Sequence, residues 1–237
     1  MEETNNMRFL IRVMKKEDVE EVARLITTVH RAREPITKIL NVSEEEYYEK
    51  YGMLAAETCV KEPLSFVCLD THLVDGEQIV GFRLGYTFNE QMVQQEIIEN
   101  KNFDPICGMI TLLKEYKLQW FQMEPDKTRL KCFFFFNLGV KEGYEKLGIA
   151  TKLTEFSINV MKQEAYDYVF VIASANGSQY IFERKCGFKE VIANEYENIE
   201  YKGIKFLKSI TNPKKLIGYE LNLCNWEASK HMVPNTF

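Results

Sequence analysis

The chain has 237 residues, of which 46% are hydrophobic and 27% charged, and its formal net charge is −5. These values are ordinary for a soluble globular protein, so we expect one domain over residues 1–237 with its core at about 8–224. The weakly acidic balance gives no support for nucleic-acid binding, and the longest apolar runs are shorter than the roughly 18 residues of a membrane-spanning helix.

The cysteines and the beginning of the sequence indicate the cellular setting. The 6 cysteines show no C-x-x-C spacing, which favours neither a disulfide framework nor a zinc site. Residues 1–6 lack the basic and apolar regions of a signal peptide. We therefore expect a cytoplasmic protein that binds no metal. We also expect no nucleic-acid partner and no membrane partner, and a protein that is a monomer or a weak homodimer.

The first part of the chain predicts a strand and two helices. Residues 9–14 predict the strand, and apolar positions at helical spacing predict a helix over 16–33. Glu34-Pro35 ends this helix, because the residue before a proline is driven away from helical geometry. A capping box at 43–46 begins a second helix, which we expect to run to about Val60.

Two strands and a helical segment follow. Residues 64–70 and 79–88 are apolar runs joined by Asp75-Gly76-Glu77, a hairpin signal that predicts antiparallel pairing. From 91 to 123 the apolar residues recur at intervals of three and four, which predicts one or two helices. Residues 124–127 then turn the chain towards its central strand.

The most informative stretch runs from Cys132 to Leu153. Within a strand predicted over 130–140, the apolar run at 132–136 is typical of a central strand buried on both sides. A short polar loop follows, and a helix is predicted from Gly148 to about Gln163. A helix start beside a small-residue loop exposes unpaired backbone N–H groups, so this junction can hold a phosphate or pyrophosphate.

The last part of the chain repeats the strand and helix pattern. Residues 168–173 predict a buried strand, parallel to the central one because a helix joins the two. A helix then runs through about Lys185 and ends at Gly187, since glycine tolerates left-handed geometry. Residues 191–201 and 214–223 predict the final strands, so the whole pattern is that of a mixed α/β protein.

Residues 140–150 and 182–188 together resemble the GNAT superfamily of acetyl-CoA-dependent N-acetyltransferases. The family signature is Gln or Arg, two residues, Gly, one residue, then Gly or Ala. Gly148 and Ala150 fit it, whereas Glu145 stands where Gln or Arg is usual. The resemblance implies an α/β fold (α+β mixed), with a mostly antiparallel central sheet of about seven strands, flanked by helices and with a splayed parallel pair at the cofactor site.

The resemblance also implies that acetyl-CoA is the co-substrate and that the reaction requires no metal. Backbone N–H groups from Lys146 to Thr151 are expected to hold the pyrophosphate. The N–H of Leu138 is expected to stabilise the oxyanion, with Leu138 and Val140 pairing to the pantetheine arm like an added strand. The implied cofactor-binding residues are Leu138, Gly139, Val140, Glu145, Lys146, Leu147, Gly148, Ile149, Ala150 and Thr151.

The implied catalytic residues come from the first helix end and the segment after residue 173. Glu34 and the two residues after it are similar to the Glu-Pro-Leu segment of insect arylalkylamine N-acetyltransferases, and Ser174 and Ser178 resemble a serine pair associated with catalysis there. An alkyl ammonium has a pKa of about 10.4, so a base, for which Glu34 is the candidate, must take its proton. Ser178 and Tyr180 compete to protonate the leaving thiolate, because Glu183 stands where many relatives have Tyr.

Other residues near the first two helices have simpler interpretations. His30 is expected to pack rather than to act, because nothing in the sequence fixes a partner for it. Tyr47, Tyr48 and Tyr51 could line an amine pocket, although a packed aromatic stripe is the simpler interpretation.

The sequence thus predicts an enzyme, an N-acetyltransferase that moves an acetyl group from acetyl-CoA to a small primary amine. An arylalkylamine is the preferred substrate class, and attack is direct, in a ternary complex. The alternatives are a protein or polyamine N-acetyltransferase and a non-catalytic CoA-binding protein, which Glu145 keeps open.

Overall fold

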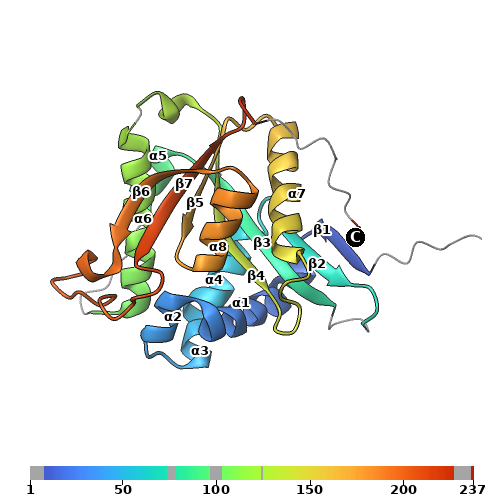
Figure 1. The fold of residues 1–237 in the computed structure, drawn as a ribbon, viewed down its shortest axis with the longest axis horizontal. Helices are drawn as coiled ribbons and strands as arrows, with labels where there is room; N and C mark the ends of the chain where they lie inside the picture. Colours follow the sequence, from blue (N-terminus) through green and yellow to red (C-terminus); the bar gives the residue numbers. More distant parts are fainter. Residues whose placement is uncertain (1–7, 74–77, 97–102, 124, 227–235) are drawn as a thin grey trace, which may run out of the picture.

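A single mixed sheet forms the centre of the protein (Figure 1). The computed structural model describes residues 8–73, 78–96, 103–123, 125–226 and 236–237. In their order across the sheet, the strands of these residues are β1 (Phe9–Val13), β2 (Phe66–Asp70), β3 (Ile79–Phe88), β4 (Cys132–Val140), β5 (Tyr168–Ala173), β7 (Lys215–Asn222) and β6 (Lys189–Glu195).

The strand directions agree with the sequence pattern. Strands β4 and β5 run parallel, joined through a helix, and the other neighbouring strands run antiparallel. The predicted mixed α/β fold, with a mostly antiparallel sheet of about seven strands and one parallel pair, is confirmed. The hairpin signal at 75–77, the turn residue 124 and the beginning of the chain at 1–6 lie outside the described residues.

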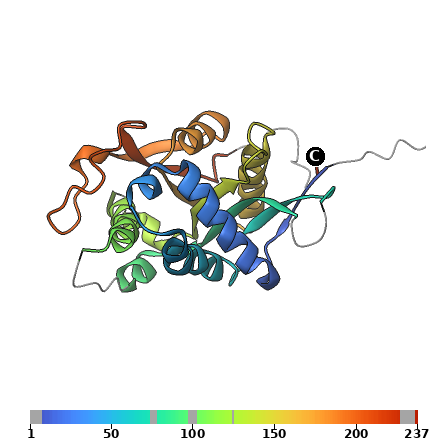
Figure 2. The ribbon, with the colours of Figure 1, turned by 90° about the horizontal axis from the view of Figure 1, so that it is seen from below.

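Helices pack on both faces of the sheet (Figure 2). No helix in the described ranges is long and apolar enough to cross a bilayer. The α-helices are α1 (Val19–Arg33), α2 (Pro35–Ile39), α3 (Glu44–Tyr47), α4 (Met53–Cys59), α5 (Glu90–Gln95), α6 (Pro105–Met123), α7 (Ile149–Gln163) and α8 (Asn176–Tyr180); the π-helical turns are η2 (Tyr48–Gly52) and η4 (Ile181–Lys185), and the 3₁₀ turns are η1 (Lys16–Asp18), η3 (Pro125–Arg129) and η5 (Tyr196–Asn198).

Strand β4 separates two hydrophobic cores. Phe134 packs with residues of α1, α4 and α6, whereas Phe133 and Phe135 pack with residues of α7. Because successive side chains of a strand point to opposite faces, one run of phenylalanines supplies both cores. The prediction of a central strand buried on both sides is therefore confirmed.

Local sequence signals set the helix boundaries. At the end of α1, Glu34 is extended, and its carboxylate accepts hydrogen bonds from the N–H groups of Ile36 and Thr37, so it caps α2. The hydroxyl of Ser43 accepts from the N–H of Glu46, as the capping-box pattern predicts. The helix predicted over 43–60 forms, with a π-helical turn, η2, between its two α-helical parts.

The parallel pair separates where β4 bends. Pairing with β5 joins Cys132 through Phe135 to Tyr168 through Val171 and ends there, although β4 continues to Val140. On the other side, the register between β3 and β4 shifts between Leu84 and Gly85, which leaves Phe136 without a partner in the ladder. Such a bulge bends its strand. The two parallel strands therefore splay apart beyond Phe135.

The prediction of a strand over 191–201 is wrong in its second half. Strand β6 begins at Lys189 and ends at Glu195, and the chain then makes the 3₁₀ turn η5. Tyr196 is fully buried at this point, and its hydroxyl donates to the carbonyl of Ser174, 2.8 Å away. Burying this ring against the body of the protein requires the chain to leave the sheet, which the alternation of residue types does not reveal.

Candidate active site

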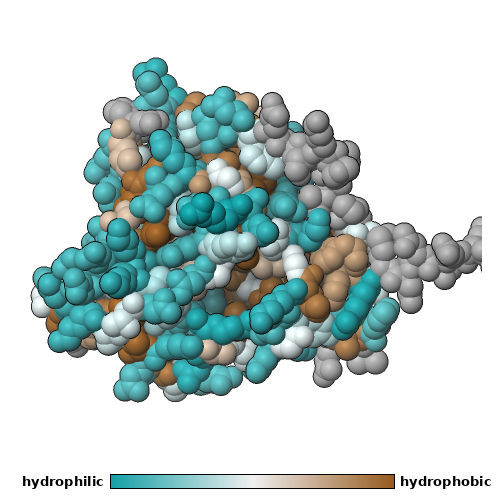
Figure 3. Space-filling model, in the orientation of Figure 1, coloured by the Kyte–Doolittle hydropathy of each residue, from teal (hydrophilic) through white to brown (hydrophobic). Residues whose placement is uncertain are grey.

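A cavity of about 680 Å³ lies where β4 and β5 separate. Its walls come from the end of α1, the bent half of β4, the loop before α7, and α8 with η4. Figure 3 shows this face of the molecule hollowed near its centre, with hydrophobic residues inside and hydrophilic ones around it. The cavity thus joins the anion-binding junction predicted from the sequence to the break between α1 and α2.

The loop before α7 is shaped by left-handed backbone. Gly143 has a φ of 84°, Lys146 a φ of 61°, and Gly148, the N-cap of α7, a φ of 82°. No side chain caps the helix, and its first turn contains no acidic residue. A Cβ built on Gly148 would have no atom of the described residues within 4 Å, so these residues leave the approach to the first N–H groups of α7 open.

Glu145 takes part in an ion pair at the rim of the cavity. Its Oε1 lies 2.7 Å from Nη1 of Arg33, the last residue of α1, and its Oε2 accepts from the N–H of Gly143 at 2.8 Å. Hydrogen bonds from its own N–H and that of Gly143, with the charge of Arg33, hold the pKa of Glu145 below its ordinary value. The second arm of Arg33, Nη2, donates to the carbonyl of Val140.

A chain of polar side chains lies at the end of α1. The carboxylate of Glu34 accepts from the N–H of Ile36 and from both the N–H and the hydroxyl of Thr37. The hydroxyl of Thr37 lies 3.1 Å from that of Tyr47, which lies 2.9 Å from Nδ1 of His30. Burial lowers the pKa of His30, so its ring is favoured in the neutral form.

His30 is buried between aromatic rings, as expected for a packed side chain. Its ring contacts those of Tyr47 and Tyr51, and burial raises the pKa of both tyrosines. Of the three tyrosines considered in the sequence, Tyr51 is the one that lines the cavity. Tyr48 instead packs beneath the guanidinium of Arg24.

Two residues of the site were missed by sequence reasoning, and Asn137 is the first. Its Oδ1 accepts from the hydroxyl of Tyr51 at 3.0 Å, whereas its buried Nδ2 finds no hydrogen-bond partner in the described ranges. It lines the cavity on the same side as Phe136, because the bulge turns both side chains towards the α1 core. An asparagine inside a continuous apolar strand was the available signal.

Arg83 of β3 is the second missed residue. It is 2% exposed, and its Nη1 donates to the carbonyls of Leu84 and Asn137 at 2.9 and 2.8 Å. Its Nε and Nη2 have no hydrogen-bond partner among the described residues. The guanidinium carbon lies 3.5 Å from the ring centre of Phe135 and 6.0 Å from that of Phe182. A single arginine in the apolar run of β3 was the signal in the sequence.

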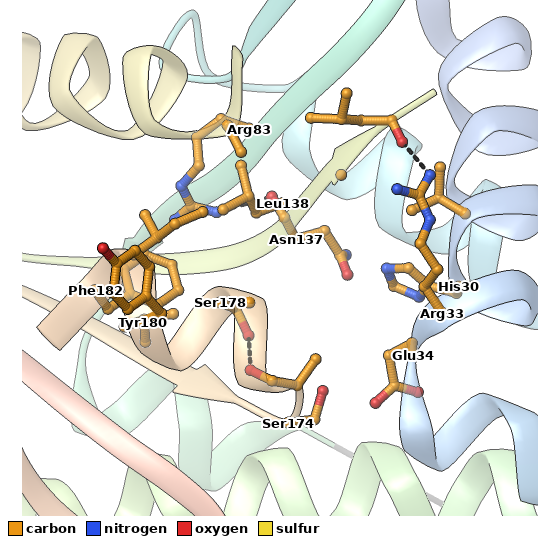
Figure 4. A pocket seen from close by; sticks show the side chains of 18 of the residues that line it. His30, Arg33, Glu34, Arg83, Asn137, Leu138, Ser174, Ser178, Tyr180 and Phe182 are labelled. Atoms are coloured by element: carbon orange, nitrogen blue, oxygen red, sulfur yellow. Dashed lines mark hydrogen bonds between the residues drawn. The ribbon is translucent and has the colours of Figure 1, made fainter. Parts of the chain in front are cut away.

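The predicted catalytic residues all line this cavity. In Figure 4, Glu34 projects from the end of α1, and Ser174 and Ser178 face it from the side of α8. The hydroxyl of Ser178 donates to the carbonyl of Ala175 at 2.9 Å. The ring of Tyr180 is more open, since the residue is 53% exposed.

Nearly all of the predicted cofactor-binding residues also line the cavity. The exception is Leu147, which is 46% exposed and is not in the lining. Glu183, which stands where many relatives have Tyr, is not in the lining either and pairs with Arg184. Among the described residues, no group of three or more His, Cys, Asp and Glu side chains could hold a metal ion. The predicted residues in the lining are Leu138, Gly139, Val140, Glu145, Lys146, Gly148, Ile149, Ala150 and Thr151.

Comparison with known proteins agrees with this geometry. Residues 28–188 match the model of the acetyltransferase (GNAT) family. This range runs from α1 to the residue before β6, so it includes the described lining residues of the cavity except Leu216.

Solved structures share the fold at low sequence identity. A Drosophila melanogaster polyamine N-acetyltransferase that forms N-acetylagmatine is 13% identical, with a TM-score of 0.74 over 90% of this chain and 99% of that one. Arylalkylamine N-acetyltransferase 2 of Aedes aegypti is 18% identical, with a TM-score of 0.71 over 92% and 100%. A mosquito arylalkylamine N-acetyltransferase-like 5b is 13% identical, with a TM-score of 0.72 over 90% and 99%.

Proposed function

The chain belongs to the acetyltransferase (GNAT) family of acyltransferases, and from this premise we propose that it transfers an acetyl group from acetyl-CoA to a small primary amine. The observation that carries the proposal is one cavity that joins the open start of α7 to the carboxylate of Glu34. An anionic acyl carrier fits the first end and an amine fits the second.

Two features of the cavity fit acetyl-CoA, which supplies an activated acetyl thioester when bound. The left-handed turn at Gly148 leaves the first N–H groups of α7 accessible to a pyrophosphate. Beyond Phe135 the edge of β4 has lost its pairing with β5, so Leu138 and Val140 can bond to a linear amide chain. The N–H of Leu138 is the proposed donor to the thioester carbonyl.

Glu34 is the proposed base. A primary ammonium has a pKa of about 10.4 and must lose a proton before its nitrogen can attack. A carboxylate offers about four acceptor positions, and three hydrogen bonds from Ile36 and Thr37 leave about one for the amine or a water. These bonds also fix the orientation of Glu34, while Ser178 and Tyr180 remain the proposed proton donors to sulfur.

The lining favours an arylalkylamine over a polyamine. A polyamine brings further ammonium groups into the cavity, and burying a charge is costly unless it is paired and hydrogen-bonded. Of the described lining residues, Glu34 and Glu145 carry carboxylates, and Glu145 already pairs with Arg33. The rest of the amine side is largely apolar and suits an aromatic ring. The apolar residues there are Val29, Ile36, Met109, Leu113, Phe136 and Leu216.

Binding and turnover measured together test the proposal. Acetyl-CoA binding is measured by calorimetry, and thiol release is then followed with tyramine, octopamine, dopamine, serotonin, spermidine and a peptide. We expect binding, and the highest kcat/KM with an arylalkylamine. Preference for spermidine or the peptide would favour the alternative substrate classes, and binding without thiol release from any amine would favour a non-catalytic CoA-binding protein.

Initial rates distinguish the proposed order of events. Direct attack in a ternary complex predicts intersecting double-reciprocal plots when both substrates are varied. Parallel lines, which indicate a covalent acetyl-enzyme, would contradict direct attack.

A further inference from the structure

A buried cation, Arg83, lines the cavity and has no anionic partner among the described residues. Arg83 is 2% exposed, and a guanidinium remains protonated at neutral pH. No ion pair joins it to a carboxylate within the part of the chain that the structure describes. Burial lowers the pKa of Arg83 below its ordinary value. The titratable groups that act on it are the thiols of Cys59 and Cys186, and burial raises the pKa of each thiol to about 12, so neither supplies a negative charge.

The surroundings of Arg83 only partly satisfy it. Nη1 bridges the carbonyls of Leu84 and Asn137, which lie beside the bulge in β4. Nε and Nη2 remain buried, and no hydrogen-bond partner for them lies in the part of the chain that the structure describes. A buried unpaired charge destabilises a fold, so its presence at a cavity wall indicates that a ligand supplies the missing negative charge.

The position of Arg83 indicates which ligand supplies this negative charge. Arg83 is the cross-strand partner of Leu138, the proposed donor to the thioester carbonyl. Its aromatic neighbours Phe135 and Phe182 belong to the α7 core, whereas Tyr47 and Tyr51, on which the charge of Glu34 acts, belong to the α1 core. A charge on the amine substrate would therefore arise on the other side of β4.

We propose that Arg83 stabilises the thiolate of CoA as it leaves, an inference that rests on the proposed acetyl transfer. As the amine nitrogen bonds to the carbonyl carbon, the carbon–sulfur bond breaks and its electron pair stays on sulfur. The unpaired N–H groups of Arg83 donate to that sulfur without losing a proton. The substrate nitrogen loses two protons, one from the ammonium before attack and one after it has bonded to the carbonyl carbon. The thiolate takes up one of these protons, and solvent takes up the other.

The geometry also explains why an arginine, rather than a proton donor alone, suits this position. Arginine cannot act as an acid, but a fixed and buried positive charge lowers the basicity of a thiolate without reorganisation. The carbonyls of Leu84 and Asn137 hold Nη1 in place, so the guanidinium is oriented before any ligand binds.

Titration of bound CoA tests the proposal without turnover. The thiolate of bound CoA is followed by ultraviolet absorbance, with the desulfo-CoA complex subtracted to remove the protein's own thiols. We expect a thiol pKa in the wild-type complex at least one unit below the ordinary value of about 8.5, and a return to that value or above in Arg83→Met. Arg24→Met, which removes an exposed guanidinium paired with Glu20, should leave the value unchanged.

Stability and rate separate a thiolate site from a purely structural role. For a thiolate site, Arg83→Met should raise the melting temperature and lower kcat at least tenfold, with little change in the KM for the amine. A fall in melting temperature would indicate that Arg83 stabilises the fold through its hydrogen bonds to the carbonyls of Leu84 and Asn137. Arg83→Gln then decides, because it keeps a neutral donor for these carbonyls; recovery of both kcat and the lowered thiol pKa in this variant would overturn the proposal.

The outcomes also distinguish the two proposals. If the wild type binds no CoA, the proposed function fails, and the role of Arg83 fails with it. If CoA binds and its thiol titrates identically in the wild type and Arg83→Met, the role of Arg83 alone is wrong.

Discussion

The guanidinium of Arg33 lies 2.7 Å from the carboxylate of Glu145 and joins the end of α1 to the loop before α7. Its other arm donates to the carbonyl of Val140, at the end of β4. One side chain therefore connects the three segments that form the mouth of the cavity. It also places a positive charge beside the position where the family signature usually has Gln or Arg.

This pair predicts opposite effects of two substitutions on acetyl-CoA affinity. Glu145→Gln removes a negative charge near the expected pyrophosphate and frees Arg33, so the Kd for acetyl-CoA should stay the same or fall. Arg33→Met leaves Glu145 unopposed, so the Kd should rise several-fold, and most at low salt. Calorimetry measures both, with Glu46→Gln of the exposed pair with Lys50 as the matched control. Weaker binding in Glu145→Gln would contradict this account.

Glu34→Ala should lower kcat/KM strongly and remove the acidic limb of its pH profile, because the variant lacks the base. It also removes the cap of α2, which costs about 1 kcal/mol of stability. Ser43→Ala controls for that cost, since it removes the side-chain cap of α3, away from the cavity lining. An unchanged pH–rate profile in Glu34→Ala would exclude Glu34 as the base.

Gly148→Pro should abolish acetyl-CoA binding, because proline cannot adopt a φ of 82° and has no N–H. Gly148→Ala should weaken binding more mildly, through about 1–2 kcal/mol of backbone strain. Gly203→Ala is the matched control, since Gly203 also has a positive φ and open space around its Cβ position, but it is not part of the cavity lining. Equal effects of both alanine variants on the Kd would show that strain at Gly148 does not act on the site.

We expect the hydrogen bonds of Asp70, which connect the end of β2 to the loop before α7, to be sensitive to acid. Its buried carboxylate accepts from Arg8, His72 and Tyr144, and chiefly the bond from Arg8 lowers its pKa from 3.8 to about 2. A lowered pKa stabilises the fold above about pH 4, and this contribution is lost as the pH falls towards 2.

Urea unfolding between pH 5 and pH 2 measures this contribution, over the range that the shifted pKa defines. Asp70→Asn should be less stable than the wild type at pH 5, and the difference should shrink as the pH falls. The exposed Asp126→Asn serves as control. A constant difference across this range would mean that the carboxylate does not titrate as predicted.

Much of the architecture could be read from the sequence because it depends on local rules. The break at Glu34-Pro35, the cap at Ser43 and the left-handed Gly187 follow from backbone sterics and side-chain hydrogen bonds within a few residues. The parallel pairing of β4 and β5 follows from the helix that joins them. The end of β6 could not be predicted, because the burial of Tyr196 depends on distant residues.

By itself, the sequence determined the order of elements, the family resemblance, and the predicted residues that meet in the cavity. Only the tertiary structure decided which charges are paired: Arg33 opposes Glu145, whereas Arg83 meets no carboxylate among the described residues. The periodicity of apolar residues predicts which face of a helix or strand a residue occupies, but not which residues that face contacts. The partner of a charge is set by packing between segments far apart in the chain, so the electrostatics of the site emerged only with the fold.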